Sequence, residues 1–212
     1  MKVAALGNPL GFEGSITKGI VSGVNRSMST ANNFAIPDTV QTDAPISQGN
    51  SGGPLVTLDG VVVGVNRAKI GSNIGFAISP ELVNKVIPKL IQDGEIKHPY
   101  MGVSTTIATP RISDAYNLDQ VRGIEVVNVV SRGPSDGKLQ GSDATEVVRG
   151  VRVPVGGDII LRVNDRKIDS IEEFSRYLMI ETTPGETVTV TVLRNGQKVT
   201  EKITLGERPP IN

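Results

Sequence analysis

The sequence contains no cysteine and no tryptophan, and aromatic residues make up only 3% of its 212 positions. Without cysteine the protein can form no disulfide, no thiolate metal site and no thiol nucleophile. With so few aromatic residues, the core must be built from valine, isoleucine and leucine, and β-branched side chains pack well on pleated surfaces. The composition therefore favours β-structure.

An excess of charge of one sign is also missing, because 22 lysine and arginine residues balance 22 aspartate and glutamate residues. Nucleic-acid binding therefore has no electrostatic support. No run approaches the about 18 apolar residues of a membrane span, and no signal peptide follows Met1. The chain opens directly into Val3-Ala4-Ala5-Leu6-Gly7, which reads like the middle of a domain, so we expect it to be part of a longer protein.

Residues 2–79 consist of short apolar runs broken by glycine, asparagine and proline, which is typical of an antiparallel sandwich or barrel. These runs are VAALG, ITKGIVSGV, TVQTDA, PLVTL, VVVGVN and IGFAI. Asp59-Gly60, between PLVTL and VVVGVN, predicts a tight hairpin in which both central turn residues have positive φ.

One helix is predicted after these strands, with Ser79 as its cap, Pro80 in its first turn and Gly94 at its end. Pro88 lies inside the pattern and should kink or divide the helix. Its apolar stripe comprises Leu82, Val86, Leu90 and Ile91.

The second half has the mixed strands and helices of a compact α+β domain. Strands are predicted over 103–108, 123–130 and 158–163, with helices over 111–117 and 171–181, the latter capped by Ser170. Asn195-Gly196 between TVTVTVLR and KVTEKITL predicts a hairpin. Residues 131–157, broken by six glycines, are predicted to be a long loop. The domain boundaries that follow are 1–93, a linker over 94–99, and 100–208.

The chemistry of the first domain centres on Ser51, in Gly49-Asn50-Ser51-Gly52-Gly53-Pro54. Acyl transfer needs an approachable hydroxyl and two convergent backbone N–H groups for the developing oxyanion. Glycines allow the unusual dihedrals that such a turn requires and leave room for a substrate backbone. The plain alternative is a glycine-rich turn with a solvent-facing serine.

The sequence around this motif resembles the HtrA/DegP family of trypsin-like proteases. The resemblance rests on LGNPLGFEGSITKGIVSGVNR, TDAPISQGNSGGPLVTLDGVVVGVN and NIGFAIS in that order. From YMGV onward, the second half resembles the PDZ domain that follows the protease in that family. The expected fold is mostly β: the C-terminal β-barrel of a trypsin-like double-barrel protease, followed by an α+β PDZ domain.

The resemblance implies a set of roles for individual residues in the first domain. Ser51 corresponds to the nucleophile, and the amides of Gly49 and Ser51 to the oxyanion hole, with Asn50 holding the turn between them. Ile46 and Ile70 would line an apolar pocket that favours a small aliphatic side chain before the scissile bond. Residues 46–50 and 67–73 correspond to loops that shape the hole and the pocket, and Asp43 is interpreted as structural.

A base for Ser51 is missing, because a serine hydroxyl normally gives its proton to a histidine oriented by an aspartate. In trypsin-like chains both residues precede the serine, yet residues 1–50 contain no histidine. The single histidine, His98, lies in the predicted linker, where a packing or capping role is the better interpretation. Lys69 is a conceivable base for a Ser-Lys dyad, but a solvated loop lysine is the better interpretation. We therefore expect no peptidase activity from this polypeptide alone.

PDZ domains bind an extended peptide as an added strand and hold its terminal carboxylate in a backbone nest. The resemblance makes Tyr100, Met101, Gly102 and Val103 the carboxylate loop and the start of the receiving edge. Phe174 and Leu178, on the helix opposite, are expected to line the groove, although both are equally compatible with an ordinary core. The loop over 131–157 is longer than the family's usual turn and is expected to alter the groove or to be a lineage insertion.

The sequence is thus interpreted as part of a serine endopeptidase acting on unfolded or misfolded polypeptides, with peptide C-termini bound at the PDZ groove. No cofactor, metal ion or nucleic acid is expected, and the family implies a trimer and a periplasmic, envelope or extracellular location. Two alternatives stay open. The first is a non-catalytic PDZ adaptor or a protease remnant, and the second is a glycine-rich β scaffold without chemistry.

Overall fold

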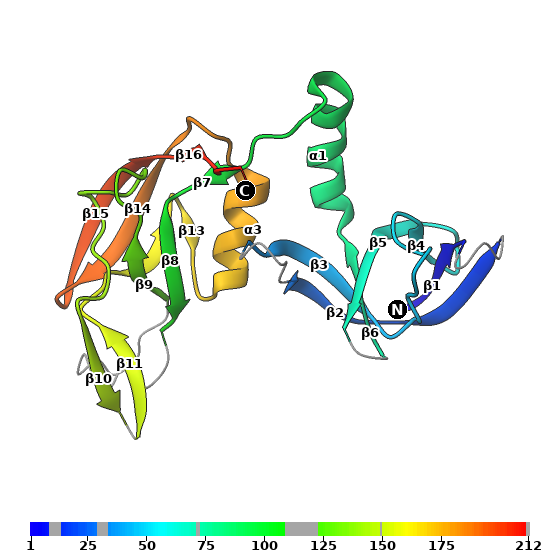
Figure 1. Ribbon diagram of the computed structural model, residues 1–212, viewed down its shortest axis with the longest axis horizontal. Helices are drawn as coiled ribbons and strands as arrows, with labels where there is room; N and C mark the ends of the chain where they lie inside the picture. The colour runs from blue at the N-terminus through cyan, green and yellow to red at the C-terminus, as the bar shows by residue number, and fades with distance from the viewer. Residues whose placement is uncertain (9–13, 29–33, 71–72, 109–122, 149, 211–212) are drawn as a thin grey trace. The chain divides into compact units, whose positions relative to one another are not determined.

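The computed structural model describes residues 1–8, 14–28, 34–70, 73–108, 123–148 and 150–210, and the side chains of 68–70 and 148 are left out of the description (Figure 1). The chain divides into two compact units, Met1–Ile96 and Lys97–Asn212. Most regular structure in both units is strand, as predicted.

The first unit is a closed six-stranded antiparallel barrel with the order β1-β2-β3-β6-β5-β4. Pairing of β1 with β4 closes it, so that Ala5 lies opposite Leu55. The strands are β1 Lys2–Gly7, β2 Ser15–Met28, β3 Ile36–Thr42, β4 Pro54–Thr57, β5 Val62–Ile70 and β6 Ile74–Ile78. The buried core comprises Val3, Ala5, Val40, Ala44, Ile46, Leu55 and Ala77. The barrel expected from the six apolar runs is confirmed.

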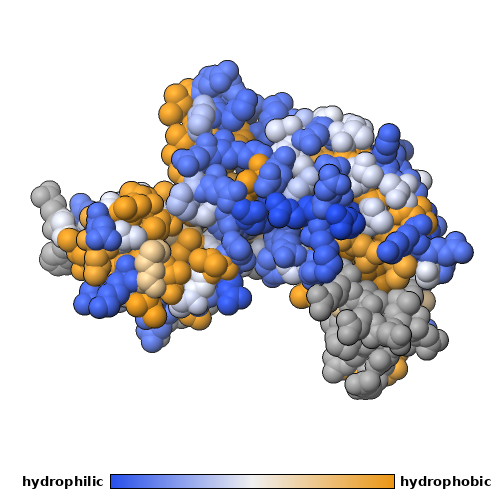
Figure 2. Space-filling model, turned by 180° about the vertical axis from the view of Figure 1, so that it is seen from behind, coloured by the Kyte–Doolittle hydropathy of each residue, from blue (hydrophilic) through white to orange (hydrophobic). Residues whose placement is uncertain are grey.

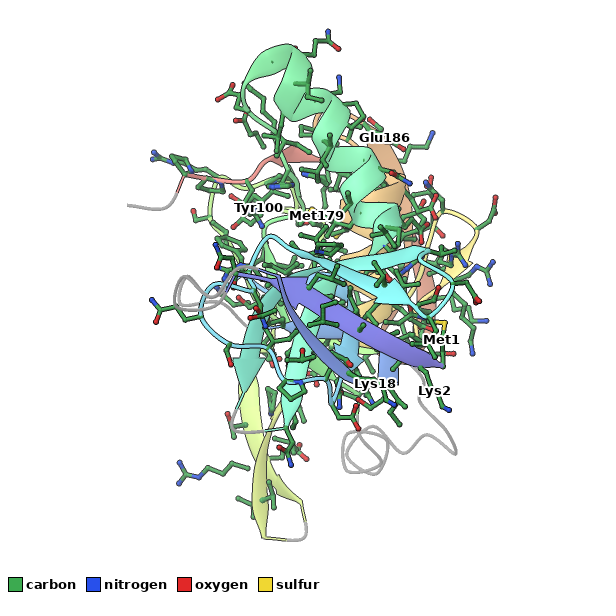
Figure 3. All side chains as sticks on the ribbon, turned by 90° about the vertical axis from the view of Figure 1, so that its right-hand side faces the viewer. Met1, Lys2, Lys18, Tyr100, Met179 and Glu186 are labelled. Carbon is green, nitrogen blue, oxygen red and sulfur yellow. The ribbon has the colours of Figure 1, made fainter. Side chains whose placement is uncertain are left out.

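The long strand β2 alternates between half-buried and exposed positions, and its exposed face carries three apolar side chains interrupted by Lys18 and Ser22. Ile16, Ile20 and Val24 are 66%, 47% and 61% exposed. Residues of high hydropathy cover much of the barrel surface seen from behind (Figure 2). Lys2 and Lys18, labelled in Figure 3, project from β1 and β2 into solvent beside them.

The turn between β4 and β5 differs from the predicted one. Only Gly60 of the pair has a positive φ, 81°. The amide of Gly60 donates to the carbonyl of Thr57 at 3.0 Å, and the amide of Thr57 donates to Val61 at 2.8 Å. This is a three-residue loop in which one glycine takes the left-handed position, so Asp59 needs no strained backbone.

Helix α1, Pro80–Asp93, has the predicted caps: the Ser79 hydroxyl accepts from the Leu82 amide at 3.1 Å, and Gly94 is left-handed with φ 74°. Of the two predicted effects of Pro88, division of the helix is wrong, because the helix continues through it, and the kink stays a prediction. Of the apolar stripe, Leu82 is buried, whereas Leu90 and Ile91 are 43% and 81% exposed. Among the described helices, none is long and apolar enough to cross a membrane.

The second unit is built on a sheet with the order β15-β14-β12-β9-β8, with β13 attached to β12. Its elements are β7 Pro99–Tyr100, β8 Val103–Ile107, β9 Ile124–Val129, β12 Ile159–Val163, β13 Arg166–Lys167, α3 Ile171–Glu181, β14 Thr187–Arg194, β15 Gln197–Thr204 and β16 Gly206–Glu207. Buried side chains of these strands and of α3 form one core. Asn195 and Gly196 have φ 51° and 78°, which confirms the predicted hairpin turn. The predicted helix over 111–117 falls outside the described residues.

The predicted loop over 131–157 is wrong in its second part. Residues Ala144–Val148 and Val151–Val155 form a two-stranded hairpin, β10 and β11. Val153 and Val155 are buried against Ala108 and Ile159, in a core separate from the one that contains α3. The hairpin therefore covers sheet side chains that α3 does not reach. The alternating apolar residues of VRVPV indicate a strand, but the glycines of this segment favoured a loop in the prediction.

The residues predicted as a linker divide between the two units at Ile96 and Lys97. Pro99 and Tyr100 pair with Glu207 and Gly206 as β7 and β16. The amide of Arg208 also donates to the carbonyl of His98 at 2.9 Å. Pairing of its first and last strands therefore closes the second unit.

Candidate functional site: the serine turn and an open sheet edge

Ser51 lies in a tight turn between β3 and β4, flanked by Gly49 with φ 98° and Gly52 with φ 86°. Two backbone hydrogen bonds define the turn, from Asn50 to Ser47 at 2.9 Å and from Gly53 to Asn50 at 3.0 Å. Positive φ at both flanking positions favours glycine over any residue with a side chain. Two successive four-residue turns, 47–50 and 50–53, therefore share Asn50 and leave Ser51 exposed.

The turn packs directly on strand β1. The Asn8 amide donates to the Gly49 carbonyl at 3.1 Å. A Cβ atom on Gly53 would lie 2.2 Å from the Leu6 carbonyl oxygen, and one on Gly7 would lie 2.3 Å from Asn50 Oδ1. Neither glycine position has room for a larger residue, so the first strand fixes the position of the turn.

Asn50 is 1% exposed, as expected of the residue that holds the turn. Its Nδ2 is 3.5 Å from the Pro45 carbonyl, and its Oδ1 finds no partner among the described residues. The amide side chain therefore lies inside the barrel wall and presents its two neighbours, Gly49 and Ser51, to solvent.

Sequence reasoning missed Asn66, which is 1% exposed and holds the other side of the turn. Its carbonyl accepts from Gly52 and its amide donates to Gly53, both at 2.8 Å. Its Nδ2 lies 3.4 Å from the Leu6 carbonyl and 3.2 Å from that of Pro54. The asparagine side chain in the apolar run VVVGVN could have indicated this role, because a buried side-chain amide normally hydrogen-bonds to backbone groups.

The Ser51 hydroxyl donates to the backbone carbonyl of Arg67 at 3.0 Å. Within the described part of the chain, no acceptor is found for the amides of Gly49 and Ser51. Two such amides flanking a hydroxyl are the donor set that an oxyanion needs. The described residues place no histidine or carboxylate in hydrogen-bond contact with Ser51, and His98 belongs to the second unit.

The predicted pocket residues have different placements. Ile46 is 4% exposed and is part of the barrel core. A Cβ atom on Gly75 would lie 2.8 Å from Ile46 Cδ1, so only glycine leaves that side chain in place. The side chains of Ile70 and Lys69 fall outside the described part. Asp43 Oδ1 accepts from the Ile20 amide at 2.6 Å, and this contact ties β2 to the segment before the turn.

The second candidate site is the edge of the sheet formed by β8. This strand pairs only with β9 among the described strands, and α3 lies beside β7 and β8. Gly102 has φ 77°, and Met101 is 2% exposed. Tyr100 and Val103 are half-buried. The four predicted loop residues therefore precede and begin an open edge strand.

Phe174 and Leu178, predicted to line the groove, lie on α3 and are 6% and 9% exposed. Both belong to the main core of the second unit, together with Ile124 and Val126. Val103 on β8 packs against the same core. Both α3 side chains are therefore core residues of the second unit, the alternative that the sequence left open, and neither is freely exposed.

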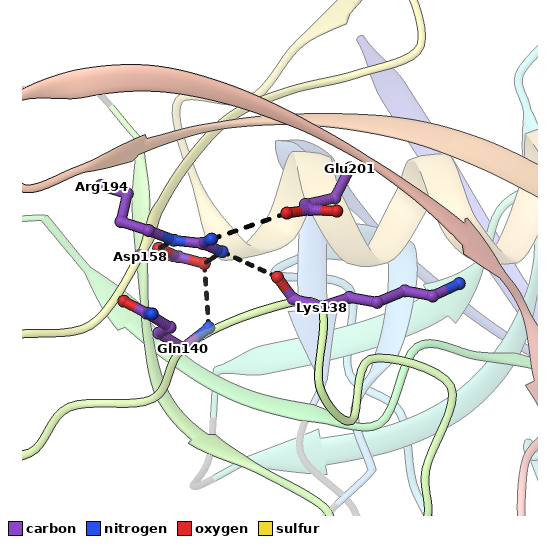
Figure 4. A network of polar contacts seen from close by, with 5 residues as sticks. All are labelled: Lys138, Gln140, Asp158, Arg194 and Glu201. Carbon is purple, nitrogen blue, oxygen red and sulfur yellow. Dashed lines mark hydrogen bonds and ion pairs between the residues drawn. The ribbon is translucent and has the colours of Figure 1, made fainter.

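An ion pair between Arg194 and Asp158 holds the backbone of Lys138 and Gln140 (Figure 4). Asp158 is completely buried and accepts two hydrogen bonds from Arg194, at 2.8 and 2.7 Å. The hydrogen bond to Asp158 raises the pKa of Arg194, and burial opposes this shift. Asp158 also accepts from the Gln140 amide at 2.9 Å, and Arg194 donates to the Lys138 carbonyl at 2.7 Å.

Comparisons with known proteins agree with both halves. Residues 99–205 match the family model of the PDZ domain, and residues 1–65 match that of the trypsin-like peptidase domain. A probable periplasmic serine endoprotease DegP-like of Chlamydia pneumoniae is 31% identical over 97% of this chain and 40% of its own length. The serine protease Do-like HtrA of Bacillus subtilis (strain 168) is 35% identical over 97% of this chain and 46% of its own length. The chain thus spans less than half the length of these curated relatives.

A solved structure of the HtrA-type protease AlgW with tripeptide superposes with a TM-score of 0.75 at 33% identity. The match covers 99% of this chain and 65% of that one. The sequence similarity and the fold of both units therefore indicate the same family. This chain belongs to the HtrA/DegP family, with a trypsin-like C-terminal barrel followed by a PDZ domain.

Proposed function

We propose that this chain supplies the nucleophile and the peptide-binding domain of a serine endopeptidase that cleaves unfolded polypeptides. Ser51 is the nucleophile, and the amides of Gly49 and Ser51 stabilise the oxyanion. The observation that carries the proposal is the exposed hydroxyl between two amides that have no acceptor among the described residues. The relatives are named serine endoproteases, which supports the same chemistry.

The proposed reaction requires a base that takes the Ser51 proton as its oxygen attacks the scissile carbonyl. The hydroxyl instead donates to the Arg67 carbonyl, which cannot accept the proton productively. In trypsin-like enzymes an aspartate-oriented histidine fills this role, and this chain has only His98. The 212-residue polypeptide alone is therefore inactive, and the histidine and aspartate come from a preceding barrel.

The substrate side of the proposal follows from the apolar surroundings of the turn. Ile46, which a Cβ atom on Gly75 would contact, and Ile70 are the proposed pocket residues, and two isoleucines there favour a small aliphatic residue before the scissile bond. At the second site, the open β8 edge receives an extended peptide, and the loop from Tyr100 to Val103 holds its terminal carboxylate. Backbone pairing tolerates many sequences, which suits substrates that are unfolded.

An experiment separates the enzyme from a non-catalytic adaptor. A hybrid joins the first barrel of the Bacillus subtilis relative, with its histidine and aspartate, to this chain, and is assayed with a fluorescent unfolded protein. We expect cleavage by the hybrid, none by the chain alone, and none by the hybrid carrying Ser51→Ala. A folded hybrid that neither cleaves nor reacts with a serine-directed phosphonate would support the adaptor instead.

Location and assembly of the parent protein are further parts of the proposal. The Chlamydia relative is named periplasmic, and we propose an envelope or extracellular location for the parent of this chain. We also propose that the parent assembles as a trimer through its protease domains. Sedimentation of the hybrid described above at a monomer mass would contradict the trimer.

A further inference from the structure

The segment behind the expected carboxylate loop contains one buried hydroxyl that the proposed function does not yet use. Ser135 is completely buried, and its Oγ donates to the carbonyl oxygen of Met101 at 2.7 Å. Pro134 touches the same loop, because a Cβ atom on Gly102 would lie 2.9 Å from Pro134 Cδ.

The Met101 carbonyl belongs to the same planar peptide unit as the Gly102 N–H. In a trans peptide these two groups point in opposite directions. A hydrogen bond that holds the carbonyl from behind therefore also sets the direction of the Gly102 N–H. No acceptor for that N–H is found among the described residues.

The next peptide unit is held in the same way. The Gly102 carbonyl accepts from the Val130 amide at 2.9 Å. Val103 lies opposite Val129 in the antiparallel ladder. The hydrogen bond from Val130 to Gly102 identifies Val103 and Val129 as a non-hydrogen-bonded pair, in which neither N–H bonds to the other residue. The Val103 N–H therefore points to the open edge. The N–H groups of Gly102 and Val103 are thus both oriented by their own peptide units, because the carbonyl of each unit accepts a hydrogen bond on the opposite side.

Ser135 is itself held firmly enough to act as such a support. Its own carbonyl accepts from the amides of Lys138 and Leu139, at 3.1 and 3.0 Å, in a single helical turn. Leu139 is buried in the main core. The turn continues into the Lys138 and Gln140 backbone groups that Arg194 and Asp158 bind (Figure 4). A contiguous set of hydrogen bonds therefore runs from the buried ion pair to the carboxylate loop.

We infer that Ser135 is a positioning residue for carboxylate recognition: its hydroxyl aligns the Gly102 N–H toward the terminal carboxylate of a bound peptide. The inference rests on the peptide-binding part of the proposed function. Hydrogen bonding to the Met101 carbonyl also polarises the peptide unit, which makes its N–H a stronger donor. Peptides that end in a free carboxylate gain from this arrangement, and peptides that end in an amide do not.

The test compares two peptides on the full 212-residue chain by calorimetric titration. One short peptide ends in valine with a free carboxylate, and the other is the same peptide with a C-terminal amide. We expect wild type to prefer the carboxylate, and Ser135→Ala to bind it about five-fold more weakly, the size of one lost hydrogen bond. The affinity for the amide peptide should change little, so the carboxylate-to-amide ratio falls.

Ser142→Ala is the matched control. Its hydroxyl lies in the same segment but donates to Glu125 Oε1 at 3.1 Å, away from the loop. This variant should keep the wild-type carboxylate-to-amide ratio, even where urea unfolding shows a similar loss of stability. A ratio that falls equally in both variants, or that stays at the wild-type value in Ser135→Ala, overturns the inference and leaves peptide binding intact. Wild type that binds neither peptide at millimolar concentration overturns the peptide-binding proposal, and the inference with it.

Discussion

The guanidinium of Arg194 binds the fully buried carboxylate of Asp158 through two hydrogen bonds, and a third reaches the backbone carbonyl of Lys138. The pair joins the last residue of β14 to the residue that precedes β12. Each hydrogen bond is charge-assisted, and together they satisfy both carboxylate oxygens. The pair therefore ties β12 and β14 to the backbone of residues 138–140.

Removing one partner of this pair should be costly. We expect Arg194→Met to lower the free energy of unfolding of the second unit by about 3 to 5 kcal/mol, because a buried carboxylate is left without its cation. Urea unfolding followed by circular dichroism measures this. Lys167→Met removes the exposed pair with Asp169 and should cost less than about 1 kcal/mol. Similar losses in the two variants would contradict the prediction.

The same pair sets a pH expectation with a defined sign. The pKa of Arg194 is raised in the folded state, chiefly by its hydrogen bond to Asp158. A raised pKa of a cation contributes stability that is fully present below its unfolded pKa and is lost as pH rises through the folded value. For arginine that loss begins above about pH 12. The contribution of Arg194 to the difference in unfolding free energy between wild type and Arg194→Met should therefore be constant between about pH 7 and 10. Urea titrations at several pH values in this range measure it.

Glycine at position 53 should be required by space and not by backbone conformation. We expect Gly53→Ala to destabilise the barrel by about 3 kcal/mol or more, because its Cβ would lie 2.2 Å from the Leu6 carbonyl and the backbone must shift. Gly60→Ala is the control, since its Cβ meets nothing within 4 Å and only its positive φ costs about 1 to 2 kcal/mol. Thermal unfolding ranks the two variants. Equal melting temperatures would show that the turn is not packed on β1 as described.

Ser79 should matter more than the cap of the other helix. Its hydroxyl accepts from the Leu82 amide and donates to Asp38 Oδ2, and all three residues are buried. Ser170 accepts from the Glu173 amide in a more exposed setting. Loss of an N-cap costs about 1 kcal/mol, and Ser79→Ala should exceed this because Asp38 also loses a donor. Chemical denaturation of Ser79→Ala and Ser170→Ala, each followed in its own unit, compares the two losses.

The outer face of β2 should limit solubility. Ile16 and Ile20 are 66% and 47% exposed on that face, and exposed apolar side chains close together promote association. Replacing both by threonine keeps the β-branch, so the barrel should remain folded while light scattering at a given concentration falls. A matched change on α1, Ile91→Thr, removes one exposed apolar side chain outside the barrel surface. If only the α1 variant lowers scattering, the β2 face is not the cause.

Local signals in the sequence were sufficient for much of the fold. Ser79 and Gly94 delimit α1, and Asn195-Gly196 places a hairpin turn, because each residue acts on its own few neighbours. Asp59 was assigned the wrong turn, since a dipeptide does not state whether two or three residues lie between the paired strands. The β10–β11 hairpin was missed because the glycines of this segment obscured its alternating apolar residues, which are buried partly against Ala108, far earlier in the chain.

The candidate site divides in the same way. Ser51 and its glycines are recognisable from the motif, because the turn is made by consecutive residues. Asn66 and Ser135 are not, since each acts on a backbone group more than ten residues away along the chain. Polar side chains that are buried to satisfy distant carbonyls leave no periodic pattern. Only the folded chain shows which carbonyl each one serves.

The pairing of β1 with β4 has a consequence for the order of folding. Residues 3–5 meet residues 55–57, so the barrel closes only when strands separated by about fifty positions find each other, and such distant contacts form slowly. The turn that carries Ser51 packs on β1 and precedes β4 directly. Ser51 is therefore expected to take its final place late in the folding of the first unit, when β1 and β4 pair.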